Sequence, residues 1–389
     1  MKFLGGLILL PIMFSASFAY AKEFEPEYKF DNGASVKLSA RLTADTYNLK
    51  NDYETGVDTK FNDTSPTRAT FIVSGKLNPK IHYKLEAWVL NGDVTWDDVY
   101  IEYEPNKNTT VWLGSNYQTS AIDGGTSSQV QTFSQKSLAS GAFTQASRNV
   151  GIAVRKNGKN WQWTSGYYGG SLALPMDRLF SQSNFVQSRF SIAPINDDNL
   201  TLHLGTSLRY RTREDDGRYS YSARPIQMNY NDSLLKTGTI GKNDTNIGLE
   251  AALSKGPYWI ILDAQHNNVK SNSVAYKFNG ASLEVAYVLS GEHRSYSVKN
   301  GNFGAIKPKK SVYSGGAGAW ALTGRYDYLD LQDNGLGGTE KGYTLGLNWY
   351  LAQKTIIRFN YAHSDFNFAQ TTNRDIKSNI FNIRLQIGF

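Results

Sequence analysis

The amino-acid sequence predicts an all-β protein, a transmembrane antiparallel β-barrel of 16 strands. Three observations predict it: apolar and polar residues alternate in many short segments, short and long connections alternate between these segments, and the chain ends on a strand-like aromatic residue. Alternation with a period of two is typical of a strand with one apolar and one polar face. Segments of about ten residues are long enough for a tilted strand to cross a bilayer.

Composition excludes several other classes of protein. The 389 residues include 24 Tyr, 19 Phe and 8 Trp but no Cys, which excludes a disulfide framework, a thiolate metal site and a Cys nucleophile. No stretch of 18 apolar residues follows the first 21 residues, so a helical membrane bundle is excluded. With five scattered His we expect no metal and no cofactor. The net charge of +7 suits anionic ligands, but 19% charged residues indicate no nucleic-acid partner.

Residues 1–21 are predicted to be a cleaved signal peptide. Lys2 precedes an apolar run at 3–14, and Ala19-Tyr20-Ala21 fits the small-x-small cleavage rule. We therefore expect an exported protein whose mature chain, residues 22–389, forms a single outer-membrane β-barrel.

The first and third candidate strands show the alternation along the chain. At 34–47, Val36 and Leu38 oppose Lys37 and Arg41. At 80–91, Leu85 opposes Lys84 and Glu86 in the same way. The sixteen candidate strands are 34–47, 66–78, 80–91, 96–105, 109–117, 148–157, 159–169, 185–195, 200–213, 244–255, 257–268, 279–290, 318–331, 339–351, 354–365 and 378–389.

The last strand gives the strongest single pattern. Phe381, Ile383 and Leu385 alternate with Asn382 and Arg384, and the chain then ends on a Phe with no polar tail. A soluble β-sandwich also alternates in this way, so the number of segments and the connections between them favour the barrel.

The connections between the strands orient the barrel. Short turns at 78–80, 105–108, 156–159, 255–257 and 352–354 follow even-numbered strands, whereas long polar loops at 48–65, 118–147, 170–184, 214–243 and 366–377 follow odd-numbered ones. Short periplasmic turns and long outer loops are typical of outer-membrane barrels, and an even strand count places both termini on the periplasmic side. The segment 291–317 is the exception, because it is long and falls on the periplasmic side.

The sequence from residue 289 onward resembles a known family. The motifs are GEHRSY at 291–296, GNFG at 301–304, KP at 307–308, GAWALTGRYDYLDL at 318–331, GLNWYL at 346–351 and the ending RLQIGF at 384–389. This series is similar to the C-terminal half of the phosphate-selective porin O/P family, whose members end one residue sooner after the last Arg.

The resemblance implies a homotrimer of 16-stranded, anion-selective channels in the outer membrane of a Gram-negative bacterium, in contact with lipid and lipopolysaccharide. It makes 118–147 the third extracellular loop, folded inward as the candidate constriction. It also implies that 291–317 is a basic periplasmic segment. The lysines of that expected cluster are Lys299, Lys307, Lys309 and Lys310.

The candidate strand at 200–213 carries the sharpest signal for a binding function. Arg209, Arg211 and Arg213 lie on its polar face, about 6.6 Å apart along the strand. A guanidinium stays charged and presents a planar set of donors that suits phosphate-like oxyanions. This row resembles the arginine ladder of the family. The alternative is that these arginines pair with acidic residues of the wall and only rigidify the barrel.

Four further basic residues are candidate pore-lining groups: Arg41, Arg68, Lys136 and Arg148. The sequence departs from the family here, because Thr67-Arg68 offers one arginine where members often carry two. The residues at 116–125 also lack the K-x-P-F-G-L-E-like run that often opens the third loop. These departures weaken the expectation of strict phosphate selectivity and leave a general anion preference. Other lumen-facing basic candidates are Lys37, Lys84, Arg155, Arg325, Arg358 and Arg384; acidic ones are Glu86, Asp98, Glu102, Glu284 and Asp327.

The sequence thus predicts a passive outer-membrane porin for small anions, with phosphate-like oxyanions as candidates. Two alternatives remain. One is a barrel enzyme that hydrolyses lipid or peptide, although none of the five His has a convincing Ser/Asp partner arrangement. The other is a structural barrel with a closed lumen. A transporter with an N-terminal plug is disfavoured, because too few residues precede the first strand.

Overall fold

The computed structural model describes residues 27–54, 56, 58–90, 93–117, 120–144, 148–172, 183–213, 218–224, 233–271, 274–369 and 375–389. The predicted signal peptide at 1–21 lies outside the described residues.

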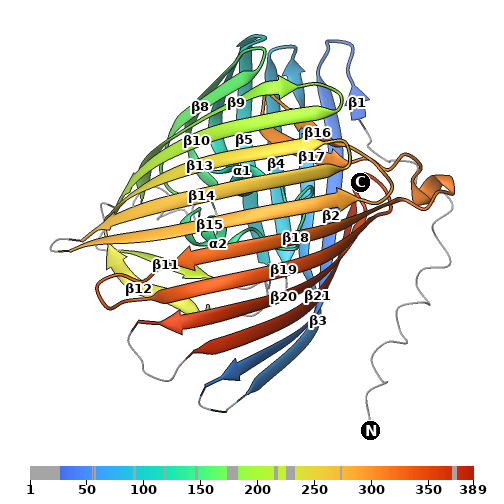
Figure 1. Cartoon of the computed structure of the whole chain (residues 1–389). Helices are drawn as coiled ribbons and strands as arrows, with labels where there is room; N and C mark the ends of the chain where they lie inside the picture. The colour runs from blue at the N-terminus through green and yellow to red at the C-terminus, as the bar shows by residue number, and fades with distance from the viewer. Residues whose placement is uncertain are drawn as a thin grey trace.

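The structure confirms the all-β, antiparallel 16-stranded barrel (Figure 1). The main sheet has 17 strands, one of which is the short β1 (Glu27–Lys29) paired with the start of the first wall strand, so 16 form the wall. The ring closes where the last strand pairs with the first, from Arg41↔Gly388 to Tyr53↔Ile376. The wall strands are β2 (Ser35–Tyr53), β3 (Thr59–Asn78), β4 (Ile81–Leu90), β5 (Asp93–Asn106), β6 (Thr109–Tyr117), β7 (Arg148–Asn157), β8 (Trp161–Tyr168), β9 (Asn184–Asn196), β10 (Leu200–Thr212), β13 (Asn243–Lys255), β14 (Tyr258–Lys270), β15 (Ala275–Val288), β18 (Ala319–Asp330), β19 (Gly338–Tyr350), β20 (Ile356–Phe368) and β21 (Ile376–Gly388).

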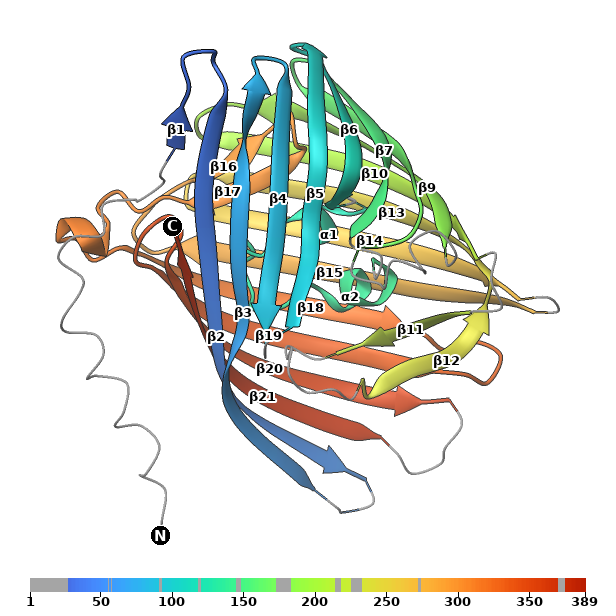
Figure 2. The ribbon, with the colours of Figure 1, turned by 180° about the vertical axis from the view of Figure 1, so that it is seen from behind.

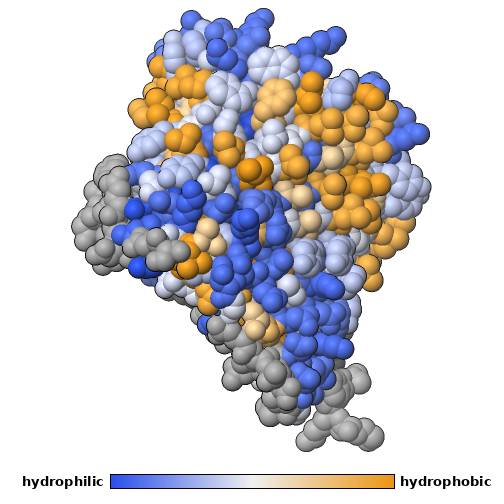
Figure 3. Space-filling view, turned by 60° about the vertical axis from the view of Figure 1, so that its left-hand side comes forward, coloured by the Kyte–Doolittle hydropathy of each residue, from blue (hydrophilic) through white to orange (hydrophobic). Residues whose placement is uncertain are grey.

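The burial of the wall is the reverse of that in a water-soluble protein. Along β10, Leu208 is 51% exposed, whereas its neighbour Arg209 is 2% exposed. The same alternation recurs along the later strands. Apolar side chains cover a band of the outer surface, with hydrophilic side chains beyond it (Figure 3). An outer apolar band around a polar interior is what a barrel in lipid requires. Among the described residues, no helix combines the length and the hydropathy needed to span a membrane.

The first long connection is shorter than the sequence predicted. Residues 48–65 were expected to form a loop, but β2 continues to Tyr53 and β3 begins at Thr59. The hydroxyls of Thr46 and Thr64 lie 2.8 Å apart across this hairpin. Polar cross-strand pairs of this kind stabilise a hairpin without apolar alternation, so the hydrophobic pattern did not reveal it.

The two ends of the barrel differ as predicted. Tight turns join β3 to β4, β5 to β6, β7 to β8, β9 to β10 and β13 to β14 at one end, here called the short-turn end. Most of the longer connections leave the other end, here called the long-loop end, whereas the segment 291–317 leaves the short-turn end.

Two of the long connections contain strands that the sequence did not predict. The segment 214–243 holds a hairpin of β11 (Tyr219–Ala223) and β12 (Leu235–Gly241). The segment 291–317 holds a hairpin of β16 (Arg294–Ser297) and β17 (Asn302–Ile306), followed by a 3-10 helix, η3 (Val312–Ser314). In Figure 2 the β16–β17 hairpin lies within the ring of strands, so we call it the inserted hairpin.

Apolar residues of these inserts form two cores inside the barrel. At the long-loop end, α2 (Leu138–Phe143) and the β11–β12 hairpin pack against β14, β15, β18, β20 and β21. At the short-turn end, α1 (Ile122–Gly125) and the inserted hairpin pack against β13–β15 and β18–β20. Both helices belong to the third loop (Figure 2). These inserts therefore fill the lumen along one side of the barrel.

Candidate ion path through the barrel

The third loop lies inside the lumen, as predicted, and arginines of the wall hold its backbone. Arg358 Nε donates to the carbonyl of Gln131 (3.2 Å), and Arg325 Nη1 donates to that of Gln135 (2.9 Å). Carbonyl groups inside a barrel need donors, and a guanidinium supplies five N–H groups in a fixed geometry. These wall arginines thus fix the course of the loop along β18–β21.

Arg209 and Arg211 of the predicted ladder point into the lumen but are buried and paired. Arg211 Nη2 lies 2.5 Å and Arg209 Nη2 lies 3.3 Å from Asp244 Oδ2. Arg209 Nη1 also donates to the carbonyl of Phe143 in α2 (2.6 Å). Arg211 and Asp244 are direct cross-strand neighbours on β10 and β13. Two guanidiniums therefore share one carboxylate beneath the third loop, and one of them also binds a carbonyl of that loop.

The β11–β12 hairpin covers these two arginines. The ring centroid of Tyr219 lies 3.8 Å from the guanidinium carbon of Arg211, and Tyr221 donates to Asp244 Oδ2 (2.6 Å). Burial raises the pKa of the Tyr221 phenol, so its hydroxyl remains a donor at neutral pH. Arg213, just after β10, has its guanidinium carbon 5.6 Å from the Tyr219 ring centroid. We call β10 and β13–β21, with the inserts that cover them, the filled side.

The opposite part of the wall borders an open cavity of about 300 Å³. The cavity lies between β6–β9, the third loop and the inserted hairpin. We call β3–β9 the open side. The lining residues are Trp112, Asn116, Tyr117, Gly125, Ser127, Val130, Arg155, Thr164, Tyr168, Gln187, Asn300, Asn302 and Phe303.

Arg155, on β7, is the basic residue of this cavity lining. It donates to Asn300 Oδ1 (2.8 Å) and to Thr110 Oγ1 (3.4 Å), and its guanidinium carbon lies 4.6 Å from the Trp112 ring centroid. Within the described part of the chain, it forms no ion pair with a carboxylate. Its hydrogen-bond partners are thus neutral, and Glu102 and Glu104 act on its charge only at longer range.

A second basic group surrounds Tyr117 at the end of β6. Lys136 of the third loop donates to the Tyr117 hydroxyl and to the Gly124 carbonyl, with its Nζ 4.4 Å from the ring centroid. Arg148 has its guanidinium carbon 5.1 Å from the same ring. Like Arg155, Lys136 has no ion-pair partner among the carboxylates that the structure describes.

Arg148 and the other two predicted basic residues of this region belong to a mixed charge network. Arg148 and Arg68 each place a nitrogen 3.5 Å from Asp97 Oδ2, and Arg148 Nε lies 3.0 Å from Asp98 Oδ1. Arg41 donates to Ser128 Oγ of the third loop (3.0 Å). Arg41, Arg68, Lys136 and Arg148 thus lie where the third loop meets the walls of β2, β3, β5 and β7.

The inserted hairpin supplies the floor of the cavity at the short-turn end. Arg189 of β9 donates to the carbonyl of Gly301 (2.7 Å) and pairs with Glu250 (2.6 Å). Gly301 has φ +57°, and a Cβ there would meet Ser191 Oγ at 2.2 Å, so the tight turn against β9 requires glycine. Thr126 of the third loop donates to Asn302 Oδ1 (3.0 Å), which joins the two inserts.

The four predicted lysines of 291–317 lie in two settings. Lys299 is in the turn of the inserted hairpin and pairs with Glu104 of β5. Lys307, Lys309 and Lys310 follow β17 and are exposed, and Lys309 donates to the Ser290 carbonyl (3.1 Å).

The sequence did not point to the aromatic and amide groups of the cavity, such as Trp112, Tyr168 and Asn300. The unexpected length of 291–317 was the available signal for Asn300. For the aromatic residues there was no signal, because 24 Tyr and 8 Trp are spread along the strands.

Comparison with known proteins agrees with this architecture. Residues 36–389 match the family described as phosphate-selective porin O and P. An "uncharacterized protein" of Caulobacter vibrioides is 27% identical over 343 residues, 81% of this chain and 66% of that protein. Porin O of Pseudomonas aeruginosa is 27% identical over 239 residues, 54% of this chain and 53% of that protein. The aligned regions thus span about two thirds and about half of these relatives.

Solved porin structures share the fold at low sequence identity. OmpT of Vibrio cholerae superposes with a TM-score of 0.56 and 12% identity, covering 94% of this chain and all of that one. An anion-selective porin from Comamonas acidovorans gives a TM-score of 0.54 and 12% identity, covering 91% of this chain and all of that one. These likenesses show the fold, and the family match identifies a channel and not a barrel enzyme. Since the family match extends over nearly the whole barrel, the chain belongs to the phosphate-selective porin O and P family and is an outer-membrane porin.

Proposed function

We propose that this porin passes small anions in preference to cations, along the open side of the lumen. The observation that carries the proposal is the cavity beside Arg155, whose guanidinium has neutral hydrogen-bond partners and no ion pair with a described carboxylate. Lys136, in the third loop, has a similar setting above it. Unpaired positive charges next to a water-accessible cavity lower the energy of an anion there more than that of a cation.

From the long-loop end, an anion would first pass Lys136 and Arg148 and then Arg155. It would leave the channel at the short-turn end, which is periplasmic in this family. Lys136 and Arg155 are held by an aromatic face and neutral acceptors, which fix them without an ion pair to a described carboxylate, whereas Arg148 also pairs with Asp97 and Asp98. At each of these basic residues, an anion can exchange part of its hydration shell for N–H donors. Conduction requires that each basic residue bind the anion weakly enough to release it to the next one.

Phosphate-like oxyanions are a narrower proposal. The resemblance to the family and the presence of planar guanidinium donors at Arg68, Arg148 and Arg155 support it. We propose a different role for Arg209 and Arg211, since both are buried and share Asp244: they hold the third loop and the β11–β12 hairpin. A conducting role for the row at 209–213 stays a prediction of the sequence.

We also propose a homotrimer embedded in lipid and lipopolysaccharide, which the resemblance to the family supports. One Vibrio cholerae OmpT structure of this fold is described as a trimer form. Chemical cross-linking of the unheated protein in detergent tests this: a ladder that stops at three supports the trimer, and a single band at one chain contradicts it.

The zero-current potential in a planar bilayer under a KCl gradient tests the function. We expect the sign set by chloride, and we expect phosphate added on one side to reduce the chloride current. Arg155→Gln should lower the anion-to-cation permeability ratio, whereas Lys307→Gln, which removes the same charge from an exposed site away from the cavity, should not. A cation-selective potential in the wild type would contradict the proposal, and the absence of any conductance would favour a closed structural barrel.

A further inference from the structure

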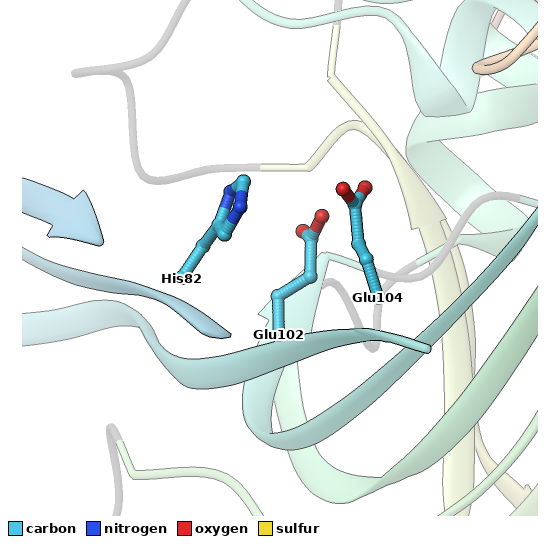
Figure 4. A group of neighbouring side chains, drawn as sticks. All are labelled: His82, Glu102 and Glu104. Atoms are coloured by element: carbon cyan, nitrogen blue, oxygen red, sulfur yellow. The ribbon is translucent and has the colours of Figure 1, made fainter. Parts of the chain in front are cut away.

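A histidine and two glutamates meet at the short-turn end of the open side. His82 on β4 is the direct cross-strand neighbour of Glu102 on β5, and Glu104 follows two residues later on the same face. One potential ligand atom from each of the three lies within 4.8 Å of the others. Figure 4 shows the three side chains pointing into the same space. The strand register brings them together, so the grouping does not depend on a loop.

The histidine has a free ligand atom. His82 Nε2 is buried, and no hydrogen-bond partner for it exists among the described residues. A buried polar atom without a partner is costly. Glu102 accepts a hydrogen bond from Trp112 Nε1 at Oε2 (2.8 Å), and its carboxyl group lies within hydrogen-bonding reach of Glu104.

A cation already occupies one edge of the group. Lys299, in the turn of the inserted hairpin, forms an ion pair with Glu104 Oε1. Lys299 and Glu104 keep 43% and 24% of their side-chain surface exposed, so water and small ions can reach them. The group therefore attracts positive charge and remains accessible from the periplasmic mouth.

We propose that His82, Glu102 and Glu104 form a binding site for a divalent first-row transition-metal ion, with Zn²⁺ as the reference ion. One imidazole and two carboxylates make a three-ligand set that leaves a fourth position for water. The imidazole nitrogen favours Zn²⁺ and its neighbours in the periodic table, whereas Ca²⁺ and Mg²⁺ favour oxygen ligands alone. This site adjoins the proposed anion path, because Trp112 contacts both Glu102 and Arg155, but metal binding does not require that the channel prefer anions.

Lys299 competes with the metal for Glu104. Metal binding requires the ammonium group to leave the carboxylate, which frees the turn of the inserted hairpin from β5. Removal of the lysine should therefore strengthen metal binding.

Titration calorimetry of the full-length mature protein in detergent, purified without a histidine tag, tests the site with ZnCl₂ alone. We expect one Zn²⁺ per chain in the wild type and at least tenfold weaker binding in His82→Ala and in Glu104→Gln. His363→Ala is the matched control, because His363 also has a carboxylate neighbour, Asp365 at 3.4 Å, but no third ligand in the described structure. Equal binding by His82→Ala and His363→Ala would overturn the proposal, as would equally tight binding of Mg²⁺.

Two further measurements keep the test independent of folding and of the proposed function. Each variant must show the wild-type gel-mobility difference between folded and unfolded barrels, so loss of binding cannot be attributed to a misfolded barrel. Glu104→Gln is nearly isosteric and serves if His82→Ala fails this check. Lys299→Ala should bind Zn²⁺ several-fold more tightly than the wild type. Unchanged affinity in Lys299→Ala would overturn the competition. Because the titration involves no ion flux, its result stands whether or not the channel prefers anions.

Discussion

The two sides of the lumen contain the same types of basic residue in opposite settings. On the filled side, Arg209 and Arg211 share Asp244 and lie beneath α2 and the β11–β12 hairpin. On the open side, Arg155 and Lys136 lie next to the cavity, with neutral partners. The difference arises from what covers each wall and not from the residue type.

This comparison indicates that a row of lumen-facing arginines is not by itself an ion path. A guanidinium that faces the lumen can bind a passing anion, a wall carboxylate or a backbone carbonyl of an inserted loop. The third loop runs along the filled side and presents its carbonyls to that wall, so most of the arginines there are used to hold it. On the open side, Arg155 and Lys136 have no ion pair with a described carboxylate, whereas Arg68 and Arg148 pair with Asp97 and Asp98.

The largest effect should come from breaking the buried charge group of the filled side. Asp244→Asn leaves two buried guanidiniums without their carboxylate, and the loss of one partner of a buried ion pair costs on the order of 3 kcal/mol. We expect a clearly lower denaturant midpoint, measured by the gel-mobility difference between folded and unfolded barrels. Asp52→Asn is the control, because Asp52 pairs with Lys50 at an exposed position, where an ion pair contributes little to stability. Equal midpoints for the two variants would contradict the structural role of Asp244.

The second-largest effect should come from the contacts by which Arg325, on the filled side, holds the third loop near Lys136. Arg325→Ala removes the donors to the carbonyls of Gln135 and Lys136. Each buried carbonyl left without a donor costs about 1–3 kcal/mol, and the loop around Lys136 should lose its fixed position. We expect larger current fluctuations in single-channel records at constant voltage. Lys341→Ala, an exposed change on β19, should leave the records unchanged; quiet records from Arg325→Ala would show that the loop is held by other contacts.

A smaller effect should follow from the charge of Lys136 alone. A unit charge about 6 Å from an ion in water contributes about 0.7 kcal/mol, or roughly 3-fold in ion partitioning. Lys136→Gln should therefore lower chloride partitioning and raise potassium partitioning about 3-fold each, which reduces the ratio of chloride to potassium permeability about 10-fold, measured from the zero-current potential. Lys136→Arg keeps the charge and should restore the ratio. If both variants behave alike, the charge of Lys136 does not act on the ion path.

The smallest effect should come from the end of the predicted ladder. The half-buried Arg213 has its guanidinium carbon 5.6 Å from the Tyr219 ring centroid, and loss of a cation–π contact at that long distance costs about 0.5–1 kcal/mol. Arg213→Gln should lower stability slightly and leave the permeability ratio unchanged. A change in that ratio as large as that of Lys136→Gln would instead support a conducting ladder on β10 and weaken the contrast between the two sides.

Much of the wall could be predicted from the sequence, because lipid imposes a strict alternation on every spanning strand. The strand predicted at 109–117 is β6, with the same bounds, and that predicted at 200–213 is β10, at 200–212. The contents of the lumen could not be predicted in this way. The β11–β12 and β16–β17 hairpins have no lipid-facing side, so no hydrophobic period marks them.

The site was predicted less completely than the wall, since partners lie far apart in sequence. The polar face of the strand with Arg209 and Arg211 was identified correctly, but Asp244 joins them only through the register of β10 with β13. His82 and Glu102 meet through the register of β4 with β5 in the same way. Scattered histidines therefore gave no indication of a ligand group.

The direct pairing of β15 with β18 has a consequence for the order of folding. Their register runs from Asn279↔Asp330 to Val288↔Ala321, so the inserted hairpin leaves and re-enters the wall at the same rim. The third loop does the same at the opposite rim, where Tyr117 pairs with Arg148. Neither insert passes through the sheet, so the ring can close first and receive both segments afterwards. The contact between Thr126 and Asn302 then forms only when both have arrived, which makes it a marker of the last stage of assembly.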